Sequence, residues 1–479
     1  MRCAPDIGRA RASFQRRWNG DEAVASQVSR PTRRDLSFLL NTHPVLHSAA
    51  LRVVVIATIT LALGGCGKGG DGPTIATVDP VPPLLLQPPA AKLPLLSIAT
   101  ANGTAIISRT TYVNATITLS DSTGTRVLEA ATEVRGRGNT TWDMPKKPYR
   151  IRLAVSTPLL GMPASRHWVL LANYSDKTLL RNDLTLDFSR MVGLAWTPRS
   201  RFVDVQLNGQ YAGVYQLVEH IRIGTDRVNI TAMRASDTTA ATISGGYLLE
   251  VDERRGETFC FNSTMTRMVF CAADPETLLD AGWDKQRAYL TSYIARTDSA
   301  IFGNQFADTS RGYAAFIDVE SAINYNIIQE VVKNVDGNLR FSTFLFKPRN
   351  GKLFFGPAWD FDLAIGNVNY NEADRVDGWY SRQSQWYTRL FQDPAFAARF
   401  KARYAELKRA GVLDSLQRRV FQRANYLNVV QKRNFERWPI LGIWVWPNRV
   451  VTGSYDGETI AMNLWLMDRL RWIDAEVSR

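Results

Sequence analysis

A change in hydrophobic period near Leu278 constrains the fold of this chain more than any other feature of its sequence. Before that point apolar and polar residues alternate, which is the period of a strand with one buried face. Beyond it, apolar residues recur three and four positions apart, which is the period of an amphipathic helix. We therefore expect an α+β fold with a sheet-rich N-terminal lobe, a helix-rich C-terminal lobe and a binding cleft where the two meet.

The same periods predict individual elements. The clearest is a hairpin over residues 202–218, in which Asn208-Gly209 supplies the positive φ angles of a tight turn. Other strands are expected at residues 112–119, 131–137, 149–153 and 246–251, with a ribbon at 341–346 and 352–355. Helices are expected at residues 177–192, 285–302, 317–333, 385–410, 415–438 and 457–476.

The N-terminal region has the pattern of a targeting sequence. Residues 1–50 contain eight Arg against four acidic residues, and we expect either an unstructured extension or a start codon assigned too far upstream. Residues 51–66 combine a basic flank with an apolar run too short to span a bilayer, which is typical of a signal peptide. They end in Leu63-Gly64-Gly65-Cys66, which resembles a bacterial lipobox and predicts lipidation of Cys66. A buried strand with a stray thiol is the alternative.

A spacer follows the predicted lipid anchor. Residues 67–92 are Gly-rich and then Pro-rich, as expected for a tether between an anchor and a folded domain at residues 93–479. We expect an exported lipoprotein of the cell envelope, attached to a membrane through Cys66. Because Gly67 is not Asp, resemblance to sorted lipoproteins favours the outer membrane in a cell that has two.

Composition and charge limit the classes of ligand and partner that this chain is expected to bind. The 479 residues are 45% apolar and 22% charged, which fits a globular protein. The net charge of +13 suits anionic partners, but no nucleic-acid-binding motif is present, so no nucleic acid is expected. Cys260 and Cys271 could form a disulfide in an exported compartment or remain two buried thiols. The four His residues lack metal-ligand spacing, which argues against a zinc hydrolase.

A glycine-containing basic turn is the first candidate for chemistry. Residues 133–142 read Glu-Val-Arg-Gly-Arg-Gly-Asn-Thr-Thr-Trp, and a second basic stretch at residues 145–153 follows. Glycines let backbone N–H groups approach a phosphate, and Arg and Lys supply the opposite charge. The turn is neither a P-loop nor a dinucleotide fingerprint, so a solvated basic hairpin is the alternative.

Two groups of acidic residues are the second candidate. Asp336 and Asn338 follow the helix expected at residues 317–333, and Asp360 and Asp362 follow the next ribbon. Phosphoryl transfer needs one group that orients the attacking hydroxyl and another that holds a metal on the phosphates. Asp and Asn after a helix are also common caps and turns, which is the alternative.

Four strings in a fixed order resemble the CotH kinase family. They cover residues 133 to 366, and the helix expected near Trp465 also fits. The strings are Arg-Gly-Arg-Gly-Asn-Thr-Thr-Trp with Lys-Lys-Pro-Tyr-Arg-Ile, residues 168–182, residues 208–219 and Gly-Pro-Ala-Trp-Asp-Phe-Asp. The resemblance implies a divergent protein-kinase-like fold that binds ATP with Mg²⁺ or Mn²⁺ and phosphorylates Ser or Thr of surface proteins.

The resemblance also implies roles for single residues. Lys146 or Lys147 would contact the α- and β-phosphates, with Glu219 as the partner of that lysine. Asp336 would orient the acceptor hydroxyl and Asp360 would hold the metal, with Asp362 and Asn338 as second choices. The residues expected to cover the phosphates are Arg135, Gly136, Arg137, Gly138 and Asn139.

A different class of function is compatible with the same fold. A catalytically silent surface module could bind proteins or glycans through exposed aromatic side chains and serve envelope assembly. Trp438, Trp444 and Trp446 are the candidates for such a surface, although tryptophans are more often part of a core.

Overall fold

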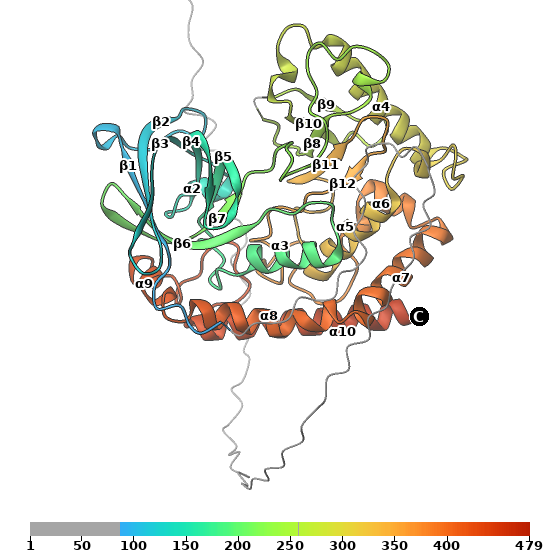
Figure 1. The fold of residues 1–479 in the computed structure, drawn as a ribbon. Helices are drawn as coiled ribbons and strands as arrows, with labels where there is room; N and C mark the ends of the chain where they lie inside the picture. Colours follow the sequence, from blue (N-terminus) through green and yellow to red (C-terminus); the bar gives the residue numbers. More distant parts are fainter. Residues whose placement is uncertain (1–86, 257) are drawn as a thin grey trace, which may run out of the picture. The chain divides into compact units, whose positions relative to one another are not determined.

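The computed structural model describes residues 87–256 and 258–479. The predicted leader, the signal peptide with Cys66 and most of the spacer lie outside this range. The described part combines sheets with helices (Figure 1), so the expected α+β class is confirmed. None of its helices is both long and apolar enough to cross a lipid bilayer.

The first seven strands form a closed barrel. Their order is β1-β2-β3-β4-β5-β7-β6, and β6 closes the barrel by pairing in parallel with β1. Inward-facing side chains such as Ile117, Ile151 and Trp168 are fully buried and fill the interior. The strands are β1 (Leu95–Thr100), β2 (Val113–Ser120), β3 (Arg126–Gly136), β4 (Tyr149–Leu159), β5 (Met162–Leu171), β6 (Ser200–Leu207) and β7 (Gln210–Glu219).

The β6–β7 hairpin has the turn that its sequence predicts. Leu207 pairs with Gln210 across the turn. Asn208 and Gly209 have φ angles of 49° and 77°, the left-handed values of a type I′ turn. The helix expected at residues 177–192 is α3 (Arg181–Val192), which ends at Gly193 in the left-handed conformation typical of a helix C-terminus.

A second sheet joins strands that are far apart in the sequence. Its order is β12-β11-β8-β10-β9, and all its pairs are antiparallel. Glu250 of β8 pairs with Phe344 of β11, which brings the segment around residue 250 to the region of Asp336 and Asp360. The strands are β8 (Tyr247–Val251), β9 (Cys260–Asn262), β10 (Val269–Asp274), β11 (Thr343–Lys347) and β12 (Phe354–Phe355).

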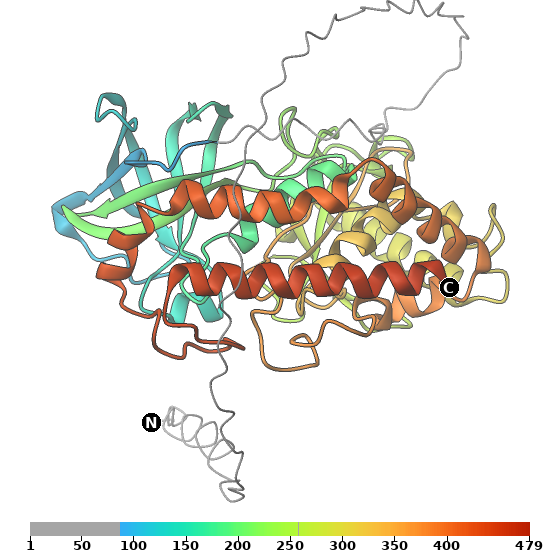
Figure 2. The same cartoon turned by 90° about the horizontal axis from the view of Figure 1, so that it is seen from below.

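Most of the described helices belong to the C-terminal half of the chain, and α8 and α10 run side by side (Figure 2). Residues 385–410 form two helices instead of the one expected, because Asp393 caps a new helix whose first residue is Pro394. Residues 415–438 are likewise divided, between α8 and α9. The helices are α2 (Thr140–Asp143), α4 (Asp284–Phe302), α5 (Val319–Val332), α6 (Gln385–Leu390), α7 (Pro394–Arg409), α8 (Val412–Leu427), α9 (Gln431–Arg437) and α10 (Tyr455–Ser478).

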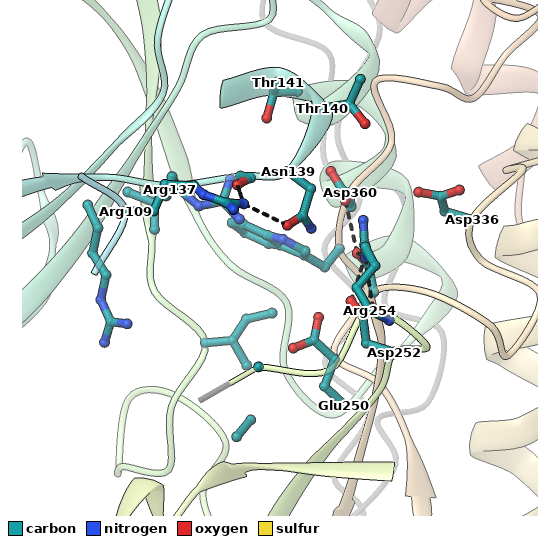
Figure 3. Close-up of a pocket in the computed structure, with 18 of the residues that line it drawn as sticks. Arg109, Arg137, Asn139, Thr140, Thr141, Glu250, Asp252, Arg254, Asp336 and Asp360 are labelled. Carbon is teal, nitrogen blue, oxygen red and sulfur yellow. Dashed lines mark hydrogen bonds and ion pairs between the residues drawn. The ribbon is translucent and has the colours of Figure 1, made fainter. Parts of the chain in front are cut away.

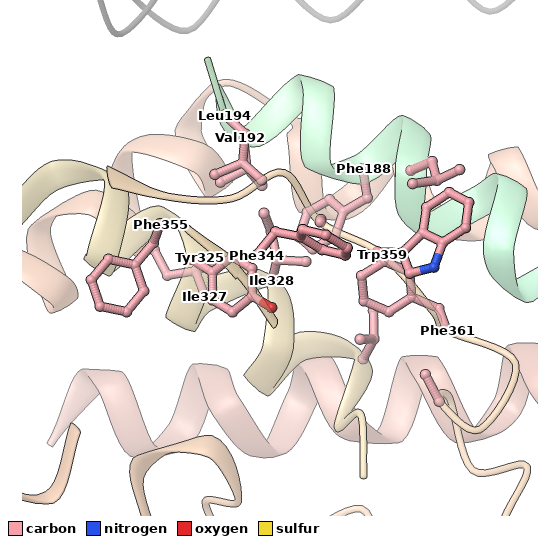
Figure 4. Close-up of a cluster of buried hydrophobic side chains, with 14 of the residues drawn as sticks. Phe188, Val192, Leu194, Tyr325, Ile327, Ile328, Phe344, Phe355, Trp359 and Phe361 are labelled. Atoms are coloured by element: carbon pink, nitrogen blue, oxygen red, sulfur yellow. The ribbon is translucent and has the colours of Figure 1, made fainter. Parts of the chain in front are cut away.

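One hydrophobic core supports the loops that carry the candidate residues. In Figure 4, Phe188 of α3 and Ile327 of α5 lie in the same cluster as Phe344, Trp359 and Phe361. Phe344 and Trp359 also line the cavity described below. The core therefore fixes the floor of the candidate site.

Candidate active site

A cavity of about 920 Å³ lies between the barrel and the five-stranded sheet. Both candidate groups reach it, because Arg137 and the carboxylates of Asp336 and Asp360 surround the same space (Figure 3). The predicted residues that line it are Arg135, Arg137, Gly138, Asn139, Asp336, Asp360 and Asp362.

The barrel side of the cavity is basic. The guanidinium of Arg137, just after β3, lies over the ring of Trp359 at 5.4 Å from its centroid. Arg109 lies between β1 and β2, and its Nη1 donates to the carbonyl oxygen of Gly138 at 2.8 Å and to Oδ1 of Asn139 at 3.0 Å. Arg109 thus holds the turn in place.

Both glycines of this turn are required by close contacts. A Cβ at Gly136 would lie 2.3 Å from the ring of Trp142, so Gly136 packs beneath the turn. Gly138 has a φ of +85°, and a Cβ there would lie 2.1 Å from the hydroxyl oxygen of Thr141. Only glycine fits this conformation without strain.

Three aspartates face the basic side. Asp336 follows α5, and Asp360 and Asp362 follow β12. The Oδ2 of Asp360 accepts a hydrogen bond from the Ser342 hydroxyl at 3.0 Å, and its carbonyl oxygen accepts one from Nδ2 of Asn334 at 3.1 Å. Asp360 has a φ of +67°, a conformation that is uncommon for residues other than glycine. Such strain often occurs at functional sites.

The carboxylates of the site repel one another. Burial and then the charge of Asp360 raise the pKa of Asp336 to about 6. The same two causes raise the pKa of Asp362 well above its ordinary value. Burial and then the charges of Asp252 and Asp360 raise the pKa of Glu250, with a value of about 8. A bound cation would relieve this repulsion.

Two carboxylates of the site have oxygen atoms that no group of the described chain occupies, as a partly hydrated cation would need. Within residues 87–256 and 258–479, the carboxylates of Asp336 and Asp362 accept no hydrogen bond and form no ion pair. No three acidic, His or Cys side chains in these ranges converge on one point. Mg²⁺ commonly takes one or two carboxylates and completes its shell with phosphate oxygens and water. Asn338 is not among the residues that line the cavity. It is half-buried, and its Oδ1 has no hydrogen-bond partner in the same ranges.

The predicted phosphate contact from Lys146 is wrong. Its side chain is 1% exposed, and its Nζ donates to the carbonyl oxygen of Val214 at 2.5 Å and to Oδ1 of Asn434 at 2.9 Å. The ammonium also lies over the ring of Tyr215. Lys146 is therefore buried between β7 and α9, where it hydrogen-bonds to both elements.

The predicted lysine–glutamate pair is also wrong. Lys147 donates to the carbonyl oxygen of Trp142 at 2.6 Å. Glu219 is fully buried and pairs with Arg199 at 2.9 Å and Arg227 at 2.7 Å. Because successive side chains of a strand point to opposite faces, the next residue, His220, lines the cavity instead.

Several lining residues were missed by sequence reasoning. Glu250 is the one carboxylate of the otherwise apolar strand Tyr247–Val251, which is a signal that could have drawn attention to it. Asp252 and Arg254, which form an ion pair, extend the same strand into the cavity. Arg150 comes from β4. Only the pairing of β8 with β11 brings Glu250 to the aspartates.

The cysteines lie at the edge of the same site. Cys260 and Cys271 are opposite one another on β9 and β10 and form a disulfide. Cys271 also lines the cavity. The free-thiol alternative therefore does not hold for this pair.

Comparison with known proteins adds to this geometry. A family model described as CotH kinase protein matches residues 134–473, which is more than half of the chain. The inner spore coat protein H of Bacillus subtilis (strain 168) is 24% identical over 251 residues. That match covers 51% of this chain and 62% of the length of the relative. The matched range of the family model contains both the basic turn and the aspartates.

Proposed function

Because the chain belongs to the CotH kinase protein family, we propose that it is an ATP-dependent kinase that phosphorylates Ser or Thr of surface proteins. The observation that carries this proposal is one cavity with Arg137 on one side and Asp336, Asp360 and Asp362 on the other. A triphosphate is attracted to the basic side, and a metal ion bound to it is attracted to the acidic side.

Apolar side chains in the cavity would contact the adenine ring of ATP. Val169, Ile221, Ala272 and Phe344 contribute apolar lining from the barrel and the sheet. Purine rings bind well to such surfaces, because most of a bound ligand contacts apolar side chains and a few polar groups orient it. Arg137 and the backbone N–H groups of the turn at Gly138 would then lie along the phosphates.

Asp336 is the proposed base of the reaction. The hydroxyl oxygen of the acceptor attacks the γ-phosphorus, the bond from that phosphorus to the β,γ-bridging oxygen breaks, and ADP leaves with that bond's electron pair. Asp336 accepts the proton of the hydroxyl. Asp360 would hold Mg²⁺ or Mn²⁺, which neutralises charge on the phosphates when bound. Of the two second choices, Asp362 is favoured over Asn338 because it lines the same cavity.

The wider setting is proposed on the same basis. The barrel and the five-stranded sheet with its helices would act as the two lobes of a divergent protein-kinase-like fold around the cavity. Lipidation of Cys66 would place the enzyme in the cell envelope, with exposed proteins as its acceptors. The proposal of Mg²⁺ or Mn²⁺ as the metal, and of Ser or Thr as the acceptor, rests on the family resemblance alone.

An alternative function is a catalytically silent binding module. Its support is an exposed apolar loop that contains Ile443 (56% exposed) and Trp444 (54%). Trp446 (37% exposed) belongs to the same loop and also lines the cavity. Trp438 does not belong to this surface, because it is half-buried and donates to the carbonyl oxygen of Ala212. A module of this kind would bind proteins or glycans without nucleotide turnover.

Calorimetric titration of the full-length protein with Mg-ATP and Mn-ATP separates the two proposals. Asp360→Ala and Arg137→Met should weaken binding at least about tenfold, which corresponds to about 1.4 kcal/mol. Lys146→Met is the matched control, and it should leave the Kd within about threefold because Lys146 lies away from the cavity. Equal heat from wild type and Asp360→Ala, or none from either, favours the binding module.

Transfer of radiolabel from ATP to a Ser-rich peptide tests the role of Asp336. Asp336→Ala should lower the rate about 100-fold or more, which is the usual contribution of a positioned base. Its nucleotide affinity should stay near that of the wild type. Unchanged transfer would remove Asp336 from this role.

A further inference from the structure

The segment of residues 372–382 lies behind the proposed base. Together with the preceding loop it packs on the residue next to Asp336, because Val335 forms a small core with Val368 and Ala373. Tyr380 contributes to the same cluster, and its hydroxyl donates to the carbonyl oxygen of Val335 at 3.4 Å. A displacement of this segment would therefore displace Asp336.

Two buried cations bind the backbone of this segment. The Nζ of Lys333, which is 2% exposed, donates to the carbonyl oxygens of Glu372 at 2.7 Å, Arg375 at 2.9 Å and Asp377 at 2.7 Å. Arg469 of α10 is fully buried, and its Nη1 donates to the carbonyl oxygens of residues 376 and 378 at 2.8 and 2.7 Å.

The indole N–H of Trp465, also on α10, donates to the carbonyl oxygen of Asp374 at 2.7 Å. Six carbonyl oxygens of one short loop thus accept hydrogen bonds from buried side chains at the end of α5 and in the middle of α10. These hydrogen bonds restrain the loop strongly. If the loop moved, each buried donor would lose its partner, which is unfavourable.

A buried carboxylate binds the other end of the segment. Glu330 of α5 is 1% exposed and accepts hydrogen bonds from the backbone N–H groups of Tyr380 and Arg382. It also forms an ion pair with Arg469 at 2.9 Å. Glu330 and Lys333 lie on the helix end that leads into Asp336, so the segment and the base share one support.

Both hydroxyls of the segment are already engaged in hydrogen bonds. Its two hydroxyl side chains are Tyr380 and Ser381. The Tyr380 hydroxyl donates to Val335, and Ser381 is fully buried with its hydroxyl oxygen accepting from Nδ2 of Asn326 at 3.1 Å. In many kinases a phosphate paired with Arg orders the corresponding kind of loop. Here the buried cations Lys333 and Arg469 bind the backbone of the loop directly, without a phosphate between them.

We propose that Lys333, Arg469 and Glu330 are positioning residues that hold residues 372–382 permanently against Asp336, so that phosphoryl transfer needs no phosphorylation of this segment. The inference rests on the proposed kinase function for its consequence in catalysis. The restraint of the segment itself does not depend on that function.

Lys333→Met tests the inference, with Lys347→Met as a matched control. Lys347 is 1% exposed, and its Nζ donates to two backbone carbonyl oxygens, those of Ser244 and Gly351, in the sheet. Both variants lose one buried ammonium and its carbonyl bonds. Hydrogen exchange of residues 372–382, nucleotide affinity and transfer rate at saturating ATP are measured for the wild type and both variants.

We expect Lys333→Met to lose protection of residues 372–382 and to transfer at least about tenfold more slowly, since a displacement of 1 Å at a reacting group can cost about 100-fold. Its nucleotide affinity should stay within about threefold of wild type. Lys347→Met should keep the protection and the rate. Wild-type protein treated with a phosphatase should keep its rate as well.

Three results would overturn the inference: unchanged protection in Lys333→Met, an equal loss of rate in Lys347→Met, or inactivation by the phosphatase. If the wild type transfers no phosphate, the proposed function fails instead. The exchange measurement then still decides whether Lys333 holds the segment.

Discussion

Asp360 has a left-handed backbone and two acidic neighbours, and each of these would destabilise an ordinary residue. Its φ is +67°, and its charge contributes to the raised pKa values of Asp336 and Asp362. Binding sites commonly keep such unfavourable groups because a ligand compensates for them. The resulting loss of stability should be measurable in the protein without ligand.

The raised pKa of Glu250 makes the stability of the protein depend on pH. Its pKa is about 8 in the folded protein, against an ordinary value of 4.5. Between these values the folded state holds a proton that the unfolded state has released, so the stability that Glu250 contributes is present at low pH and lost as the pH rises toward 8. Glu250→Gln has no ionisable group at this position, so it lacks this part of the pH dependence.

We expect the melting temperature of Glu250→Gln, relative to wild type, to increase between pH 5 and pH 8.5 in metal-free buffer. Thermal unfolding across that range checks this. Glu253→Gln, at an exposed position that is 46% accessible in its side chain, shows whether the effect depends on burial. A difference that stays constant with pH would contradict the assignment.

At the scale of elements, short strands at the edge of the five-stranded sheet carry part of the site. β9 has three residues, and its ladder partner is β10, which contributes Cys271 and Ala272 to the cavity. So short an edge strand has little intrinsic stability. The cross-strand disulfide between Cys260 and Cys271 compensates for this by joining the two strands.

Replacing both cysteines by serine should therefore destabilise the protein. We expect the free energy of unfolding to fall by roughly 3 kcal/mol, as estimated for a closed loop of about this length. Denaturant titration of the wild type and the double variant measures the difference. Reduction of the wild type should reproduce it, and equal midpoints in both proteins would show that the edge strand is held by other contacts.

At the scale of the described molecule, the barrel and the helices share a core. One cluster of buried side chains includes Leu93 before β1, Val218 on β7, Ile327 on α5 and Ile473 on α10. The barrel interior is a separate cluster, but the outer face of β7 packs against α9. Contact across such an extended core makes independent unfolding of the barrel unfavourable.

A single thermal transition is expected for the described part. Leu170→Ala in the barrel interior and Ile327→Ala in the helical core remove fully buried side chains. Each should lower the stability of the same transition by about 2–5 kcal/mol. Calorimetry and circular dichroism on both variants check this. Two transitions, each affected by one substitution, would mean that the barrel unfolds separately.

Sequence by itself determined the elements whose signals are local. The Asn208-Gly209 turn, the periodic strands and helices, and the residue types of the basic turn and the aspartates all follow from neighbours in the chain. Helix ends were less predictable, because Asp393 and Pro394 divide a continuous apolar pattern.

Only the tertiary structure decided which of these residues meet. Lys146 and Glu219 had the right chemistry for a phosphate site, but strand direction and the contact with α9 place them elsewhere. Glu250 had no local motif, yet the pairing of β8 with β11 brings it to the aspartates. The physical reason is that a strand presents alternate side chains to opposite faces, and long-range pairing sets which face meets the cavity.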